Sequence, residues 1–525
     1  MYFPFLYDKV KDSERRVKLT RKNSIKTIFA NCLFGFSTAE LFALRWARTQ
    51  YPMHKAYNVF FVVKSDTKGH DSGTFLSFCT HIILPTILVC FIVRLISFLF
   101  DTLYKKIYGH TPVTYFNNIK KHLQLNIVYV VSATLFSVFM LKAWKYPLIF
   151  YEVHKKPVQS AFYEKNYVNP KNVSVTFPDK KRNLIVIFME SMESSYASIA
   201  DGGVFDENLI PGLTSLGQQN INFSETSKLG GGENLEGTSW TAAGMISKLG
   251  GVPYFSPFSK ESNRKETCLP GAVFLTDILA QNGYKNIFSI GSDKQFENRD
   301  IILEDHHMEV HDINWYKKYG EIPPDYHVFW GFEDEKLFAI TRKELTDLGS
   351  GEQPFFYGML TVDTHFPDGY KSRNCPKIFK RQIMNVIRYS DTQICSLIDW
   401  MKKQSWYENT TIVIMGDHNF LNAPDNNFIV EESPLPDAES RRRWLDIIVN
   451  SVLKAPQFVQ KNRQFSPYDM YPTMLESIGC TIEGHALGFG RSLYTGGKTL
   501  VEQYGADMIN TELMRRTLEY DALKK

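Results

Sequence analysis

The sequence predicts an α/β protein in which helices sandwich a mostly parallel sheet, preceded by an N-terminal transmembrane helical region. After residue 180, apolar runs of strand length alternate with amphipathic runs of helical length. That alternation is typical of parallel strands covered on both faces by helices. Before residue 150 the chain carries long apolar runs, and its 525 residues are too many for one ordinary core.

Three apolar segments in the first part of the chain are long enough to span a bilayer, near residues 25–46, 75–100 and 125–146. The first contains Glu40, which is costly in hydrocarbon, so topology has to decide the count. A basic N-terminus and a lysine-bearing loop at 101–124 both fall on the cytoplasmic side if there are three spans. Residues 1–146 are therefore predicted to be a membrane domain, with everything after residue 147 outside the cytoplasm.

Prolines at 157, 170 and 178 break any long helix in residues 147–181, which predicts a linker before a catalytic domain at 182–525. Within that domain, continuous apolar runs predict strands, and apolar residues at helical spacing predict helices. The expected order is a strand at 183–191, a helix at 209–219, a strand at 221–229, a helix at 241–249, a helix and strand within 274–293, a strand within 352–367, a helix at 384–404 and a strand from 411.

Composition excludes some functions and leaves others open. The net charge of +4 gives no case for a nucleic-acid partner. Four of the seven cysteines fall in the part predicted to be exported, where disulfides can form. Because Cys268 and Cys375 both lie in polar loops, they are the pair we would join first, although spacing does not determine connectivity.

Polar side chains with metal-binding chemistry follow three of the predicted strands. Glu190 follows the first strand, Asp363 and His365 follow a later one, and Asp417 and His418 follow the strand that begins at 411. In an open parallel sheet, ligands bind outside the carboxyl ends of the strands. Two carboxylates and an imidazole suit Mn²⁺ or Zn²⁺, and Mg²⁺ less well.

A bound metal of this kind activates either water or a protein hydroxyl for attack on phosphorus or sulfur. The hydroxyl should lie at a helix N-terminus, where backbone N–H groups favour an anionic reaction centre. Thr238, Ser239 and Thr241, which open the predicted helix at 241–249, are the choices. Taken alone, each of them would more often be an ordinary helix cap.

Four blocks resemble, in order and spacing, the membrane-bound phosphoglycerol and phosphoethanolamine transferases of the alkaline phosphatase/sulfatase superfamily. They are "NLIVIFMES", "GTSWTAAGMISKLGGVPYFSPF", "LTVDTHFPDGY" and "TIVIMGDH". The strongest resemblance is to phosphoglycerol transferases that modify osmoregulated periplasmic glucans, and next to lipoteichoic acid synthases. It covers most of residues 180–495 and implies a sulfatase/alkaline-phosphatase-like fold.

The resemblance also implies roles for particular residues. Glu190, Asp417 and His418 correspond to metal ligands, and Thr238, which we prefer to Thr241 on register, to a nucleophile that touches the same ion. His365 corresponds to an active-site histidine that contacts phosphate or assists the leaving group or acceptor. Within "QFENRD", Arg299 corresponds to a phosphate-binding arginine. The chain departs from the synthase pattern at Glu297, where the synthase has a tryptophan.

These roles imply a metal-dependent enzyme of the bacterial inner membrane with its catalytic domain facing the periplasm. It would move phosphoglycerol from phosphatidylglycerol to a periplasmic or cell-surface glycan through a phospho-threonine, with Mn²⁺ as the expected ion. One alternative is a phosphoethanolamine transferase acting on lipid A or a core sugar. Others are a sulfatase-like hydrolase or phosphodiesterase, and a lipid-sensing pseudoenzyme. Residues 238–242 lack the Cys/Ser-x-Pro-x-Arg stretch of formylglycine sulfatases.

Overall fold

The structure is a computed structural model that describes residues 158–255, 269–421 and 427–525, together with 79–108 and parts of 32–45 and 131–138. The chain divides into two units. One contains the described residues before Tyr151, and the other contains Glu152–Lys525. The second unit carries the α/β architecture and is described first.

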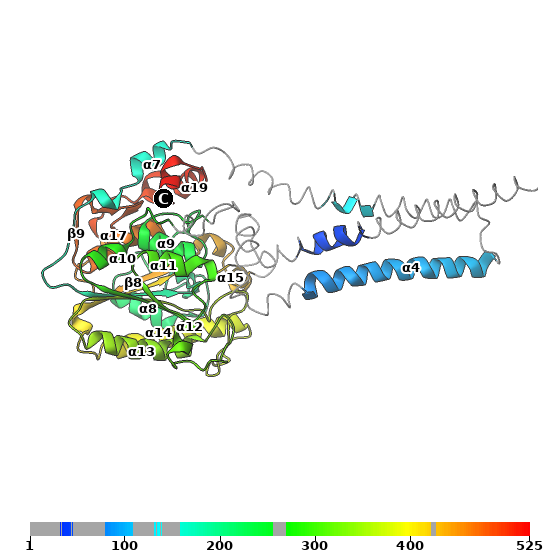
Figure 1. Ribbon diagram of the computed structural model, residues 1–525, viewed down its shortest axis with the longest axis horizontal. Coiled ribbons are helices and arrows are strands. Elements are labelled where there is room, and N and C mark those ends of the chain that lie inside the picture. Colours follow the sequence, from blue (N-terminus) through cyan, green and yellow to red (C-terminus); the bar gives the residue numbers. More distant parts are fainter. Residues whose placement is uncertain are drawn as a thin grey trace, which may run out of the picture. The chain divides into compact units, whose positions relative to one another are not determined.

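A seven-stranded sheet forms the centre of this unit (Figure 1). Five neighbouring strands run parallel, in the order β7-β2-β6-β4-β5, and two antiparallel strands, β8 and β3, extend the β7 edge. This confirms the predicted mostly parallel sheet. The strands, in chain order, are β2 (Asn183–Met189), β3 (Gly231–Gly232), β4 (Lys285–Ile290), β5 (Glu309–His311), β6 (Phe355–Leu360), β7 (Thr410–Gly416) and β8 (Trp444–Val449).

Helices cover both faces of the sheet. In Figure 1, α8 (Pro211–Gln219), α13 (Asp334–Gly349) and α14 (Gln382–Met401) lie below it, and α9 (Thr241–Gly250), α10 (Leu275–Gln281) and α17 (Met470–Ser477) lie above it. Every residue of the central strands β2 and β7 is consequently buried, which explains their uninterrupted apolar runs. The shorter helices of the unit are α7 (Ala161–Asn166), α11 (Arg299–Asp305), α12 (Ile313–Lys318), α15 (Phe428–Glu432), α16 (Gln457–Gln460), α18 (Leu500–Tyr504), α19 (Ala506–Leu513) and α20 (Leu518–Ala522).

The register of β2 against β7 determines where the site forms. Met189 pairs with Gly416, the last residues of the two strands. The Asp417 amide then donates to the Met189 carbonyl at 3.1 Å. Glu190 and Asp417 therefore leave the same edge of the sheet side by side.

The strand predicted at 221–229 is not formed. Ile221 makes a single bridge to Ile448 beside β8, and the segment then turns. Ser224 and Thr226 accept local backbone hydrogen bonds, from the Thr226 and Lys228 amides, that favour turns over a ladder. The two glycines of β3, further along the chain, pair with β8 instead. At Gly231 the two backbones lie too close to leave room for a side chain.

The second half of the segment predicted to be a linker belongs to the folded unit. β1 (Val175–Thr176) pairs with β9 (Thr481–Ile482), and Val158 bridges to Thr517. Backbone pairing holds β1, and Phe162 and Tyr163 of α7 pack on Phe489. Elements this short show no apolar periodicity from which they could be predicted. A second small hairpin joins β10 (Ala486–Leu487) and β11 (Gly490–Arg491).

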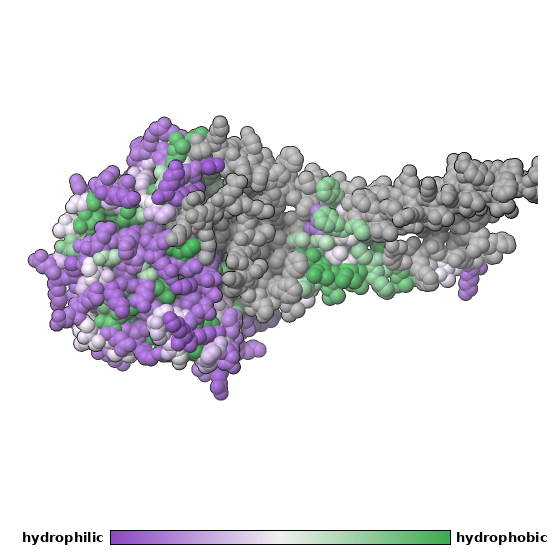
Figure 2. Space-filling model, in the orientation of Figure 1, coloured by the Kyte–Doolittle hydropathy of each residue, from purple (hydrophilic) through white to green (hydrophobic). Residues whose placement is uncertain are grey.

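In the first unit, α4 (Leu84–Tyr108) follows a short π-helical turn at Cys79–Ile83. Apolar side chains of this helix are exposed, whereas the visible face of the second unit is mostly hydrophilic (Figure 2). No helix among the described residues is long and apolar enough to cross a membrane. About half of the span predicted near 25–46, and most of the one near 125–146, lies outside the described residues.

The suggested Cys268–Cys375 bridge is not supported. Cys375 is a free, buried thiol whose sulfur lies 3.5 Å from the Asn385 carbonyl. Cys268 lies outside the described residues. The other two cysteines of the exported part, Cys395 and Cys480, are also free thiols.

Candidate metal centre

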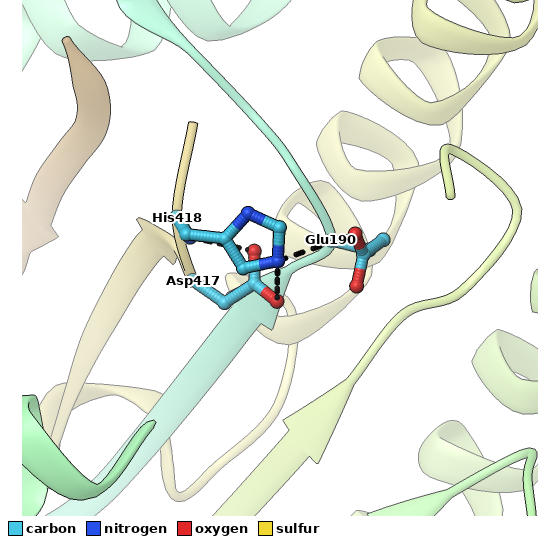
Figure 3. Close-up of side chains that lie close together, drawn as sticks. All are labelled: Glu190, Asp417 and His418. Atoms are coloured by element: carbon cyan, nitrogen blue, oxygen red, sulfur yellow. Dashed lines mark hydrogen bonds and ion pairs between the residues drawn. The ribbon is translucent and has the colours of Figure 1, made fainter. Parts of the chain in front are cut away.

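Three side chains with metal-binding chemistry meet at the carboxyl edge of the sheet (Figure 3). Glu190 follows β2, and Asp417 and His418 follow β7. One ligand atom from each lies within 4.8 Å of the others, and all three residues are buried. Among the described residues they are the only group of this kind.

The imidazole of His418 is oriented for coordination by its own hydrogen bond. Nδ1 lies 2.7 Å from the Asn419 carbonyl, and because a carbonyl only accepts, Nδ1 carries the proton. The Nε2 lone pair therefore faces the two carboxylates, 3.6 Å from Glu190 Oε1 and 3.5 Å from Asp417 Oδ2. A metal-binding histidine is commonly held in this way.

Short hydrogen bonds hold one oxygen of the Asp417 carboxylate, and its other oxygen has no hydrogen bond among the described residues. Asp417 Oδ1 accepts from the Ser191 amide at 2.8 Å and from the His418 amide at 2.7 Å. Its Oδ2 is buried without a hydrogen-bond partner among the described residues. Burial, reinforced by the charge of Asp417, raises the pKa of Glu190 well above its usual range. Two buried acids with an unpartnered oxygen and an aimed nitrogen lone pair fit a divalent cation, which would offset their repulsion.

The hydroxyl that meets this cluster belongs to Thr241. Its Oγ1 donates to Glu190 Oε2 at 3.2 Å and lies 3.4 Å from His418 Nε2. Thr241 is the first residue of α9, so its hydroxyl lies at the positive end of that helix.

Thr238, the residue preferred from sequence, is engaged elsewhere. Its Oγ1 donates to the Leu235 carbonyl at 2.8 Å and accepts from the Leu235 amide at 2.9 Å, and the residue is fully buried. The Thr238 hydroxyl thus closes the turn that precedes α9. Trp240, between the two threonines, has an extended backbone, so α9 starts at Thr241 and carries its hydroxyl to the cluster.

Helix α9 packs directly on the turn that bears the ligands. A Cβ on Gly244 would lie 2.1 Å from the Asp417 carbonyl oxygen, so only glycine allows this approach. One turn further along α9, the buried Lys248 donates from Nζ to the same oxygen at 2.7 Å and lies over the Trp444 ring. Burial lowers the pKa of Lys248 to about 7. Neither residue stood out in the sequence, because their function depends on the approach of α9 to this turn.

His365 and Arg299 were both expected at the site from the sequence. His365 lies in the loop after β6, and Arg299 is the first residue of α11, which follows β4. Burial lowers the pKa of His365 to about 4, with a further lowering by His418. Its Nδ1 donates to the Phe366 carbonyl at 2.9 Å, so the ring presents Nε2 as an acceptor. Arg299 is buried and donates to Ser292 Oγ at 3.1 Å and to the Asp293 carbonyl at 2.9 Å. Burial lowers the pKa of Arg299, and the charges of Glu297 and Glu190 oppose that change.

Glu297, where the sequence departs from the synthase pattern, is buried against the start of α9. Its Oε2 accepts from the Ala242 amide at 2.9 Å, directly after Thr241. Burial raises the pKa of this carboxyl to about 7, although Arg299 opposes the rise. Both Glu297 and Asn298 have positive φ, 59°, which is uncommon for residues with a side chain.

Two other groups of titratable side chains are held by hydrogen bonds within the fold. Asp363 is buried and exchanges hydrogen bonds with Asp334, since each backbone amide donates to the other carboxylate, which anchors the loop that carries His365. Burial and the neighbouring Asp334 raise the pKa of Asp363. His306 and His307 both hydrogen-bond to Asp277, with ring nitrogens 2.7 and 2.9 Å from its oxygens, and His306 is buried whereas His307 is exposed.

The arrangement as a whole is suited to nucleophilic chemistry on an anionic centre. It combines a metal-binding cluster, a hydroxyl at a helix N-terminus, a neutral imidazole and a guanidinium. These come from loops after four neighbouring strands, β7, β2, β6 and β4, and from the start of α9.

Comparison with known proteins agrees with this architecture. A family model described as Sulfatase matches residues 182–479. Phosphoglycerol transferase I of Escherichia coli O6:K15:H31 is 32% identical over 287 residues, which are 51% of this chain and 36% of that protein; a second E. coli strain gives 31%. This chain thus matches about a third of the length of those relatives.

Two solved structures among those similar to this chain are a synthase and a transferase. One is the lipoteichoic acid synthase LtaP of Listeria monocytogenes, with a TM-score of 0.47 and 17% identity over 62% of this chain and 79% of that one. Another is the lipooligosaccharide phosphoethanolamine transferase A of Neisseria meningitidis, with a TM-score of 0.46 and 13% identity over 86% and 84%. Since the family model covers more than half of the chain, the protein belongs to the sulfatase family of the alkaline phosphatase/sulfatase superfamily.

Proposed function

We propose that this protein is a metal-dependent phosphotransferase that moves phosphoglycerol from phosphatidylglycerol to a glycan hydroxyl, with Thr241 as the nucleophile. The observation that carries the proposal is the contact of the Thr241 hydroxyl with Glu190 and His418, two of the three candidate ligands. Phosphoglycerol as the transferred group is supported by the two phosphoglycerol transferases I, which this chain matches over about a third of their length.

The ion bound by Glu190, Asp417 and His418, Mn²⁺ by preference and Zn²⁺ or Mg²⁺ otherwise, would supply Lewis-acid stabilisation of the reacting oxygens. The chain supplies the rest of the chemistry. Thr241 Oγ1 gives its proton to His365 Nε2 and bonds to phosphorus, and the bond from phosphorus to the diacylglycerol oxygen breaks. His365 passes that proton to the diacylglycerol oxygen and diacylglycerol leaves, so the phosphoglycerol group remains on Thr241.

A second displacement completes the transfer. The acceptor hydroxyl loses its proton to His365 Nε2 and bonds to phosphorus, the bond to Thr241 Oγ1 breaks, and His365 returns the proton to Thr241. His365 can accept because its pKa of about 4 keeps it neutral at pH 7. Arg299 supplies positive charge beside the phosphoryl oxygens.

The location proposed from sequence is the bacterial inner membrane, with residues 182–525 in the periplasm. It is supported by the apolar runs of the first 146 residues and by their basic loop. Such a location would bring the site to the lipid donor and to an extracytoplasmic glycan.

The donor is tested with labelled lipids. The full chain, loaded with Mn²⁺ in mixed micelles, is incubated with phosphatidylglycerol or with phosphatidylethanolamine, and diacylglycerol release is measured. Release from phosphatidylglycerol with label retained on the protein or an acceptor is the expected result. Formation of free glycerol phosphate in the absence of an acceptor would instead indicate a phosphodiesterase.

Phosphoethanolamine transfer is the second candidate because one observation favours it. The buried carboxylate of Glu297 beside Thr241 would complement an ammonium group. In the same experiment, diacylglycerol release from phosphatidylethanolamine and not from phosphatidylglycerol would identify phosphatidylethanolamine as the donor.

A further inference from the structure

We propose that Glu193 is a positioning residue for the candidate metal centre and orients the imidazole of His418 through a backbone peptide unit. That unit joins Asn419 to Phe420, and the buried guanidinium of Arg442 holds the Glu193 carboxylate against it. The proposal rests on the metal-binding part of the function proposed above and is independent of the lipid donor and of the acceptor.

The peptide unit between Asn419 and Phe420 makes one hydrogen bond on each side. Its carbonyl, that of Asn419, lies 2.7 Å from the protonated Nδ1 of His418. Its amide, that of Phe420, donates to Glu193 Oε1 at 2.8 Å. Because the carbonyl and the amide of a trans peptide unit point in opposite directions in one plane, fixing the amide also fixes the carbonyl. A hydrogen bond from the amide to a carboxylate also polarises the unit, which makes the carbonyl a better acceptor for the imidazole.

Arg442 anchors the carboxylate on the other side. Its Nε donates to both oxygens of Glu193, at 3.1 and 3.2 Å, and its Nη2 donates to Oε1 at 2.5 Å. Nη2 also donates to the Phe420 carbonyl, and Ser195 Oγ donates to Glu193 Oε2. Since both oxygens of Glu193 are engaged in this way, the carboxylate acts on the orientation of the imidazole and is not itself a ligand.

The hydrogen bond from Phe420 to Glu193 joins the two segments that supply the candidate ligands. Glu193 lies three residues after Glu190, on the segment that follows β2, and Phe420 lies two residues after His418, on the segment that follows β7. The bond therefore fixes these segments beyond the last paired residues of the two strands. The orientation of His418 depends on it because only Nε2 of the ring can face Glu190 and Asp417. Contacts that orient a metal-binding histidine typically change metal affinity about 10–100-fold when they are removed.

A buried ion pair that only supported the fold would have no specific effect on the ion, so the test compares two double variants. Glu193→Gln/Arg442→Met removes both charges and keeps a side-chain oxygen that can accept from the Phe420 amide. Glu193→Leu/Arg442→Met removes the same charges and that acceptor as well, in a side chain of similar size. Loss of the ion pair is common to both variants, and they differ in the hydrogen bond to the peptide unit.

Mn²⁺ binding to the metal-free full chain in detergent micelles is measured by calorimetry, alongside denaturant unfolding. The glutamine variant should bind Mn²⁺ within about threefold of the wild type, and the leucine variant at least about tenfold more weakly. Pulsed EPR of the bound Mn²⁺ should show coupling to an imidazole nitrogen in the wild type and in the glutamine variant, and weaker coupling in the leucine variant. Glu193→Asp, which keeps the charge on a shorter side chain, should also bind Mn²⁺ at least about threefold more weakly.

Glu502→Gln is the matched control, because it weakens another ion pair with a buried arginine, Arg463, whose Nε lies 2.7 Å from Glu502 Oε1. It should lower the stability and leave Mn²⁺ affinity unchanged. Equal Mn²⁺ affinity in the two double variants would overturn the proposal and leave Glu193 and Arg442 as supports of the fold. If the leucine variant does not fold, unchanged affinity in Glu193→Asp would overturn it in the same way.

Failure of the proposed function gives different results. If the wild type binds no Mn²⁺, the candidate metal centre is wrong, and the role of Glu193 falls with it. If the variants bind Mn²⁺ as expected but no lipid releases diacylglycerol, the transferase function fails while the role of Glu193 stands.

Discussion

Replacing Thr241 with valine removes one hydroxyl and keeps the shape of the side chain, and Thr238→Val makes the same change three residues earlier. The structure predicts opposite outcomes for the two variants. Thr241 Oγ1 contacts Glu190 and His418, whereas both hydrogen bonds of Thr238 Oγ1 go to Leu235. One hydroxyl therefore faces the candidate metal centre and the other faces the backbone.

The expected magnitudes follow from those contacts. Loss of the nucleophile should lower kcat by at least about 10³-fold, since serine enzymes lose up to about 10⁶-fold on the same change. Thr238→Val leaves the buried Leu235 amide without its acceptor, which should lower the free energy of unfolding by about 1–3 kcal/mol. Thr241→Val should change stability by less, because Glu190 keeps its 2.6 Å hydrogen bond from Ser191.

The assay measures diacylglycerol release from labelled phosphatidylglycerol per folded molecule, alongside denaturant unfolding of each variant. Thr238→Val should retain activity within about threefold and unfold earlier, because its structural role lies in the turn. Full activity in Thr241→Val together with loss of activity in well-folded Thr238→Val would refute the assignment and restore Thr238 as the nucleophile.

Three further predictions follow from the site. Asp417→Asn and His418→Ala should each lower bound Mn²⁺ to below a tenth of the wild-type content in metal analysis, and full occupancy in either would remove that residue from the centre. Gly244→Ala should weaken Mn²⁺ binding at least about tenfold, because its Cβ would meet the Asp417 carbonyl at 2.1 Å, and an unchanged affinity would show that α9 does not fix the turn. The pKa of His365 is about 4 in the folded chain against 6.5 ordinarily, so the unfolded chain binds the extra proton between these values. The stability from this residue should be complete above pH 6.5 and fall by about 3 kcal/mol as pH drops to 4; His365→Gln should lose that slope in pH-dependent unfolding, and an equal slope would contradict the burial of a neutral ring.

The central sheet was predictable because its strands are buried on both faces. Runs such as those of β2 and β7 are apolar throughout, and the acidic residues that end them stand out against the run. The same signal identified Glu190, Asp417 and His418 as candidate ligands, and the structure brings them together. By contrast, β1 pairs with β9 through backbone groups, which no side-chain pattern reports.

The choice between Thr238 and Thr241 could not be made from sequence because both open the same helix. It depends on whether the turn at 235–238 closes before the helix begins, and the hydrogen bonds from Thr238 to Leu235 close it. Glu297 contacts the Ala242 amide from a segment in which Glu297 and Asn298 both have positive φ. The residue types at these two positions do not predict that conformation. Local backbone geometry therefore determines which of the two threonine hydroxyls lies beside the candidate ligands.

The most direct test of the account is to locate the covalent intermediate. The Mn²⁺-loaded chain is incubated with phosphatidylglycerol in the absence of an acceptor, quenched in acid, digested and analysed by mass spectrometry. Thr241 lies within "GTSWTAAGMISK", residues 237–248, and fragmentation should place one phosphoglycerol group on that residue. Diacylglycerol release with the adduct on Thr238, or with no adduct on this segment, would contradict transfer through Thr241.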